Sequence, residues 1–252
     1  RSYEIPQHDR ADRISISTNS QSTVKPRDLR SNDKRVLALK KAFEQRYPDG
    51  QFLSKRGEQI QAGKNSARAI DLGTLGKNLM AWHSQRPNIS YSETKIFDKY
   101  FEQLFKRDYT PERIAALQDW MTALEPSWGK DNPQGLNETL LAMRSYVPYH
   151  HLYAISMCFS VASKHTDRVP APDVAWQQAQ AKGIVEWVVS VAATALNFAL
   201  ETAANETQPG GKVFSPVNWI KTKSCLSAIT NAISMQLMMM PNIPGGKEKR
   251  DA

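Results

Sequence analysis

The stretch "RISISTNSQSTVKPRDLRSNDKRVLALKKAF", residues 13–43, changes character twice along its length. Ile14 and Ile16 alternate with polar residues, which predicts a short strand over 13–17. Small polar residues follow and favour a turn, because Ser, Thr and Asn side chains bond to nearby backbone groups. A dense run of Lys and Arg comes next. The stretch therefore predicts a strand that leads through a polar turn into a basic helix.

The basic helix has a clear apolar face. Val36, Leu39 and Phe43 recur at three- and four-residue intervals, so the helix should run to about residue 46. We expect Ser31 or Asn32 to cap its start, since both residue types accept hydrogen bonds from free backbone amides. A further short strand is expected within "QFLSKRG", which begins at residue 51.

The remaining chain is patterned mainly as helices. Thr110 followed by Pro111 marks one helix start, Asp173 is expected to cap another, and a continuous last helix is expected from residue 215. The fold class is therefore mainly α with a small α+β N-terminal segment and a multi-helix body. We divide the chain into a basic α+β segment, a helical body that shares its core, and a mobile tail. Their bounds are residues 1–66, 67–240 and 241–252.

Composition narrows the class of protein. The 252 residues carry a formal net charge of +8 and a sequence pI of about 9.4, which favours acidic partners and nucleic acid first among them. Cys158 and Cys225 lie among apolar neighbours and read as reduced, buried thiols of a cytoplasmic protein. The first residues lack the apolar region of a secretory signal. The missing initiating Met indicates a fragment or a processed chain.

The segment 181–204 is long and apolar enough to raise the question of a membrane span. Polar residues nevertheless recur along it at three- and four-residue intervals and form one stripe. A bilayer would penalise Glu186 and Asn197 near its middle. We therefore expect a mostly buried helix with one wet edge, and no membrane partner.

A specific signal comes from "ISISTNSQSTVKPRDLRSNDKRVLALKKAFEQR" followed by "SKRGEQ", which resembles the abortive infection phage resistance (AIPR) family of prokaryotic proteins. The similarity covers the first 60–80 residues well and the rest loosely, with a weaker match in "SPVNWIKTKSC". The elements that carry it, in order, are Thr18, Asn19, Gln21, Val24, Asp28, Leu29, Asn32, Asp33, Lys55, Arg56 and Gly57.

The resemblance implies a role in phage defence, beside other defence-system proteins. It does not by itself carry over a biochemical activity. Family members usually have an upstream Asn-Gly-x-Gln element, which this chain lacks. The resemblance therefore implies the C-terminal portion of a longer protein, with any upstream chemistry missing here.

Positive charge is concentrated near the amino end. Residues 25–68 hold twelve Lys or Arg against five Asp or Glu, so this segment carries nearly the entire surplus of the chain. Such charge beside amide side chains suits phosphate backbones. The alternative is a solvated helix face or a partner surface. The candidate nucleic-acid-binding residues are Asn19, Gln21, Lys25, Arg27, Arg30, Lys34, Arg35, Lys41, Lys55 and Arg56.

Two of these candidates have a structural alternative. The side chains of Asn19 and Gln21, with Thr18 beside them, can form hydrogen bonds to a base edge or a phosphate. The same residue types also stabilise turns by forming hydrogen bonds to nearby backbone groups. Both interpretations stay open at this point.

Catalytic and metal-binding patterns are weak. The chain has no G-x-S-x-G, P-loop or G-x-G-x-x-G motif. His150 and His151 point about 100° apart on a helix, so they are expected in the core rather than on one metal. Trp128 lies in a predicted loop and is a candidate contact for a partner or a base. We expect no catalytic residue, metal or cofactor in this segment.

The working hypothesis is non-catalytic nucleic-acid contact through the basic segment, by phosphate neutralisation with counterion release. One alternative is a protein-interaction module, in which the basic residues dock an acidic partner of a defence complex and the Met-rich last helix packs against it. Another alternative is part of a nuclease-like enzyme whose active site lies upstream.

Overall fold

The structure is a computed structural model, and it describes residues 25–106, 109–163, 169–206 and 213–239. The strand predicted over 13–17 and the tail predicted over 241–252 lie outside the described residues. The fold is mainly α with one small parallel sheet, which confirms the predicted class.

Short elements make up the N-terminal half of the described chain. In order they are α2 (Pro26–Arg30), α3 (Lys34–Arg46), β1 (Gln51–Leu53), η1 (Ser66–Arg68), β2 (Ala69–Asp71), α4 (Leu72–Trp82), α5 (Pro87–Ser90), α6 (Glu93–Lys95), the π-helical turn η2 (Ile96–Tyr100) and α7 (Phe101–Phe105). Longer helices dominate the rest. They are α8 (Pro111–Leu124), η3 (Glu125–Trp128), α9 (Glu138–Ala142), α10 (Val147–Ala162), α11 (Pro172–Ala181), α12 (Val185–Asn205), α13 (Pro216–Trp219) and α14 (Lys223–Met239).

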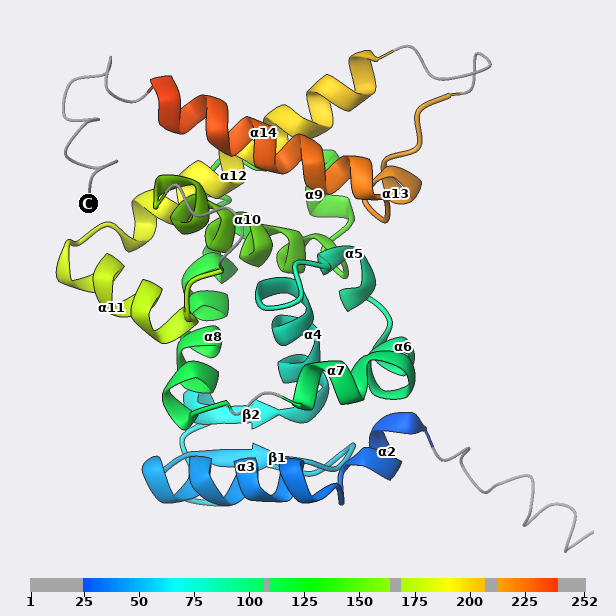
Figure 1. Cartoon of the computed structure of the whole chain (residues 1–252). Coiled ribbons are helices and arrows are strands. Elements are labelled where there is room, and N and C mark those ends of the chain that lie inside the picture. Colours follow the sequence, from blue (N-terminus) through cyan, green and yellow to red (C-terminus); the bar gives the residue numbers. More distant parts are fainter. Residues whose placement is uncertain (1–24, 107–108, 164–168, 207–212, 240–252) are drawn as a thin grey trace, which may run out of the picture.

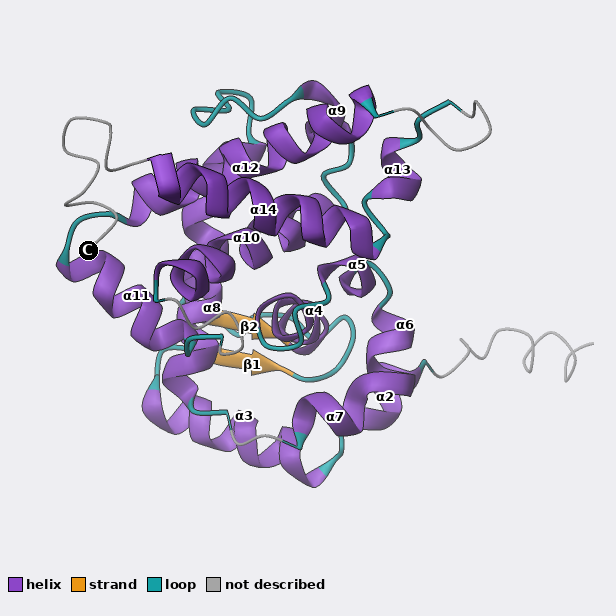
Figure 2. Ribbon diagram, turned by 45° about the horizontal axis from the view of Figure 1, so that its top comes forward, coloured by secondary structure: helices purple, strands orange, loops and turns teal. Residues whose placement is uncertain are grey.

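The elements form three levels. Figure 1 shows α3 and the two strands at one end, α4, α8 and α10 in the middle, and α12 and α14 crossing at the other end. Figure 2 shows the strands between α3 on one side and α4 and α8 on the other. One continuous apolar core runs through all three levels, as expected from the absence of a long linker.

The two strands pair in parallel across the boundary predicted at residue 66. Phe52 of β1 lies opposite Ile70 of β2, and both side chains are buried. The strand at residue 51 is confirmed, whereas the second strand at Ala69–Asp71 replaces the start of a predicted helix. Three residues are too few to show a strand periodicity, so the pairing depends on contacts that local sequence does not carry.

Helix starts follow local hydrogen-bonding chemistry. Asp33 caps α3, because its side chain accepts from the amide of Arg35. The expected cap at Ser31 or Asn32 is wrong, since Ser31 instead closes α2. Thr110 caps α8 as predicted. Asp173 does not cap α11, because Pro172 already occupies the first turn and places the carboxylate inside the helix.

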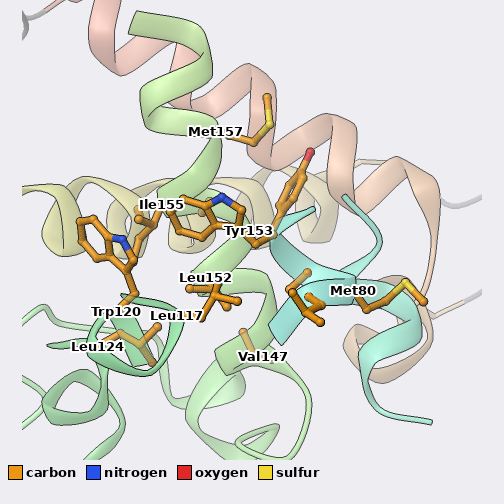
Figure 3. Packing of buried hydrophobic residues seen from close by; sticks show 14 of the residues in the cluster. Met80, Leu117, Trp120, Leu124, Val147, Leu152, Tyr153, Ile155 and Met157 are labelled. Carbon is orange, nitrogen blue, oxygen red and sulfur yellow. The ribbon is translucent and has the colours of Figure 1, made fainter. Parts of the chain in front are cut away.

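The centre of the core lies between α8 and α10. Figure 3 shows Leu117, Trp120 and Leu124 of α8 facing Leu152 and Ile155 of α10. All five side chains are almost fully buried. Removing apolar side chains from water is the main favourable term in folding, so this contact stabilises the middle level of the molecule.

The C-terminal elements depart from prediction in one place. The continuous last helix is divided into α13 and α14, because the Thr222 hydroxyl accepts from the amide of Cys225 and starts a new helix. By length and composition α12 could cross a membrane, but 56% of its most apolar window is buried inside the protein. That burial is typical of a core helix and accounts for its apolar composition.

Candidate nucleic-acid interface

The predicted contact residues fall on three neighbouring segments. Asn19 and Gln21 lie outside the described residues. Of the others, Arg27 and Arg30 belong to α2, with Lys25 just before it. Lys34, Arg35 and Lys41 belong to α3, and Lys55 and Arg56 follow β1.

Arg27 is buried and forms the centre of an ionic cluster. It is 6% exposed, and its guanidinium donates to Asp71 at the start of α4 and lies 3.7 Å from Glu93 of α6. Gly73 makes this approach feasible, because a Cβ there would lie 2.7 Å from Arg27 Nη1. Arg27 therefore anchors α2 to the body and is not available to a phosphate.

Arg35 and Arg30 converge on a carboxylate of α7. Arg35 donates to both oxygens of Glu102 and also to Asp33, and Arg30 Nη1 lies 3.2 Å from Glu102 Oε1. Both guanidiniums lie over the Phe101 ring, at 4.5 and 4.9 Å from its centroid. The hydrogen bond from Arg35 lowers the pKa of Asp33 to about 2 and also lowers the pKa of Glu102.

The other paired cations follow the same pattern. Each lies within 4 Å of a carboxylate in the described structure. These pairs are Arg56–Asp28, Lys40–Glu58, Arg46–Glu112 and Arg68–Asp119. Seven of the twelve cations are thus paired, and carboxylates of the helical body offset most of the segment's surplus charge. Arg27, Arg30, Arg35 and Arg46 hold the N-terminal elements against the body, whereas Arg56–Asp28 lies within the N-terminal segment.

Four lysines among the predicted nucleic-acid-binding residues make no ion pair in the part of the chain that the structure describes. They are Lys25, Lys34, Lys41 and Lys55, and all four are exposed. Lys34 and Lys41 are seven residues apart on α3, so they share its outer face, about 10 Å apart along the axis. Leu37 lies between them and is 46% exposed. We call Lys34, Leu37 and Lys41 the outer face of α3.

His150 and His151 make hydrogen bonds inside the core. His150 Nε2 donates to the carbonyl of Ile220 over 2.8 Å, and His151 Nε2 donates to the carbonyl of Val189 over 2.9 Å. Burial lowers the pKa of each histidine to about 4. Their predicted place in the core is therefore confirmed. Within the described ranges, no group of three or more His, Cys, Asp or Glu could hold a metal.

The structure also tests the predictions for Trp128 and the two cysteines. The prediction that Trp128 is a loop residue free to contact a partner is wrong, because η3 folds its ring into the core, 5.9 Å from the His151 ring. Cys158 and Cys225 are buried free thiols, as predicted, and burial raises the pKa of Cys158 to about 12.

Sequence reasoning missed two surface features. One consists of Tyr91, Lys95, Tyr146 and Lys221, which lie near the ends of α5, α6, α10 and α14 and which no local motif links. The other is an open groove of about 630 Å³ between α12 and α14, lined in part by Phe198, Trp219 and Met235. Met235 of this lining is 50% exposed, and Met238 and Met239 further along α14 are 74% and 63% exposed.

A family model described as AIPR protein matches residues 3–237, which is nearly the whole chain. No curated protein and no solved structure matches significantly.

Proposed function

The chain belongs to the AIPR protein family, and on that premise we propose that it serves defence against phage by binding nucleic acid through unpaired lysines. The family suggests abortive infection as the setting. The contact would be non-catalytic and made through phosphates. The outer face of α3 would be its centre, with Lys25 and Lys55 beside it.

The observation that carries this proposal is the division between arginines and lysines. The arginines of α2 and α3 are committed to carboxylates, which match the planar fork of a guanidinium. Lys40 pairs with Glu58, but Lys25, Lys34, Lys41 and Lys55 are exposed and make no ion pair within the described ranges. Their ammonium groups act as point charges toward phosphate, where counterion release favours binding.

Salt dependence tests the proposal directly. Four phosphate contacts should weaken binding on the order of 100-fold between 50 and 200 mM salt. We expect Lys34→Gln/Lys41→Gln to lower the slope of log K against log salt by about two, because each lysine releases about one counterion. Fluorescence anisotropy with a labelled 20-base-pair duplex measures this slope.

The matched control removes the same charge elsewhere. Lys130→Gln/Arg144→Gln changes two exposed residues of other segments and should leave the slope nearly unchanged. Absence of binding at 50 mM salt, or an equal effect of both double variants, would refute the lysine contact.

A second candidate is docking of an acidic protein partner. Leu37 is exposed between Lys34 and Lys41, and an apolar side chain framed by charge is favourable at a protein interface. The exposed Met235 and Met238 offer an adaptable apolar surface on α14, at the opposite end of the molecule. Binding to the 20-base-pair duplex with the expected salt slope would favour nucleic acid over this candidate.

A further inference from the structure

Two tyrosines and two lysines gather on the surface away from α3. Tyr91, just after α5, meets Tyr146, just before α10, with ring centroids 5.8 Å apart in an edge-on arrangement. Lys221 Nζ lies 5.4 Å from both ring centroids, and Lys95 Nζ lies 5.7 Å from that of Tyr91. We call these four residues the tyrosine–lysine cluster.

The two ammonium groups face aromatic rings rather than carboxylates. Lys95 Nζ donates to the Tyr91 hydroxyl over 3.4 Å, and neither lysine makes an ion pair within the described residues. Glu93, two residues before Lys95, is directed toward Arg27 instead. The backbone of Lys221 is held in place, since its carbonyl accepts from Asn88 Nδ2 over 3.2 Å. The positive charge of the cluster is therefore available to a ligand.

The ring of Tyr91 is also accessible. Its residue is 37% exposed, and the Tyr146 ring packs against it at an interplanar angle of 79°. An exposed aromatic ring flanked by cations matches how proteins hold an unpaired nucleotide, with the base stacked on the ring and the phosphate beside the ammonium groups. A base within a duplex cannot offer its face in this way.

We propose that the tyrosine–lysine cluster binds one unpaired nucleotide of a single-stranded nucleic acid. The base would stack on Tyr91, and Lys95 and Lys221 would contact the flanking phosphates. This inference rests on the proposed nucleic-acid contact and adds a preference for single strands. Figures 1 and 2 both show α2 beside α6, the helix that ends at Lys95 of the cluster.

Anisotropy with two labelled probes tests the inference on the full chain. The probes are a 15-nucleotide oligo(dT) and a 15-base-pair duplex, both at about 50 mM salt, which favours phosphate contacts. We expect Tyr91→Ala to weaken binding of the single strand about fivefold or more, because stacking on an aromatic ring contributes that much per base. Binding of the duplex should change less than twofold.

Two further variants separate stacking from folding. Tyr91→Phe keeps the ring and should retain most single-strand affinity. Lys95→Gln/Lys221→Gln keeps both tyrosines and should weaken single-strand binding more than Lys130→Gln/Arg144→Gln does. This lysine pair also tests the cluster if Tyr91→Ala fails to fold.

The outcomes distinguish the two proposals. Wild-type binding to both probes with no selective loss in Tyr91→Ala and no excess effect of Lys95→Gln/Lys221→Gln would overturn the cluster and leave the α3 contact standing. Binding to neither probe would overturn both. Equal loss on both probes in Tyr91→Ala would also overturn the single-strand preference.

Discussion

The N-terminal elements and the C-terminal helices are held to the body by different interactions. Around α2 and α3, arginine–carboxylate pairs such as Arg27–Asp71 and Arg35–Glu102 join the elements to α4 and α7. Within the described parts of α10, α12 and α14, no ion pair is formed. Apolar side chains make those contacts instead. The buried His150 and His151 of α10 add hydrogen bonds to the carbonyls of Ile220 and Val189.

The comparison shows that charged side chains that hold the fold together must be distinguished from those that are free to bind a ligand. A sequence rich in cations is not the same as a surface rich in free cations, because an arginine satisfied by a carboxylate offers little to a phosphate. The apolar end instead leaves methionines and Phe198 exposed beside a groove. The two ends should therefore respond differently to mutation, pH and salt.

The largest effect is expected from the apolar end. Leu196 of α12 is 1% exposed, and Leu196→Ala should lower the free energy of unfolding by about 2–5 kcal/mol, since a cavity adds to the lost burial. Urea denaturation measures this cost. Phe198→Ala, two residues along the same helix and 44% exposed, is the control and should cost much less. Similar costs for both would show that the α12 packing is wrong.

Acid should weaken the C-terminal helices before it weakens the N-terminal ion pairs. His150 and His151 have a pKa of about 4 in the folded protein against 6.5 ordinarily, so the unfolded state binds more protons between these values. Stability is therefore complete above about pH 6.5 and falls toward pH 4, by about 1.4 kcal/mol per unit for each histidine. Asp33, with a pKa of about 2, loses its contribution only at lower pH.

Urea denaturation between pH 7 and pH 5 measures this loss. His150→Gln removes one titrating group and can still donate to the carbonyl of Ile220, so it should remove about half of the pH dependence. An unfolding free energy that is constant from pH 7 to pH 5 would contradict the burial of both rings.

Sequence could predict the parts of this comparison that depend on local pattern. Val36, Leu39 and Phe43 were spaced as one apolar face, and all three are buried. Thr110 before Pro111 marked the start of α8. Each of these signals lies within one element, where helix geometry relates spacing to a face.

The candidate site was less predictable because its charge partners are distant in sequence. Asp71 pairs with Arg27 across 44 positions, and Glu102 with Arg35 across 67. No local pattern reports such a pairing, so free and structural cations look alike in the sequence. The cluster at Tyr91 and Lys221 was missed for the same reason.

The smallest effect lies within the ion-paired end. The Arg27 side chain is 7% exposed and that of Arg35 is 37% exposed, although both are paired. Arg27→Gln should cost about 2 kcal/mol of unfolding free energy, because it leaves carboxylates without their charged donor. Arg35→Gln should cost about 1 kcal/mol or less, as surface pairs do.

Salt separates the two arginines further. Raising the salt concentration from 0.1 to 1 M shortens the screening length to about 3 Å, so the cost of Arg35→Gln should fall toward zero. The cost of Arg27→Gln should fall less, because the Arg27 side chain is buried, although its partner Asp71 is 38% exposed. Urea denaturation of both variants at the two salt concentrations gives the comparison. Equal costs that salt reduces equally would mean that Arg27 is a surface cation, which would return it to the nucleic-acid interface.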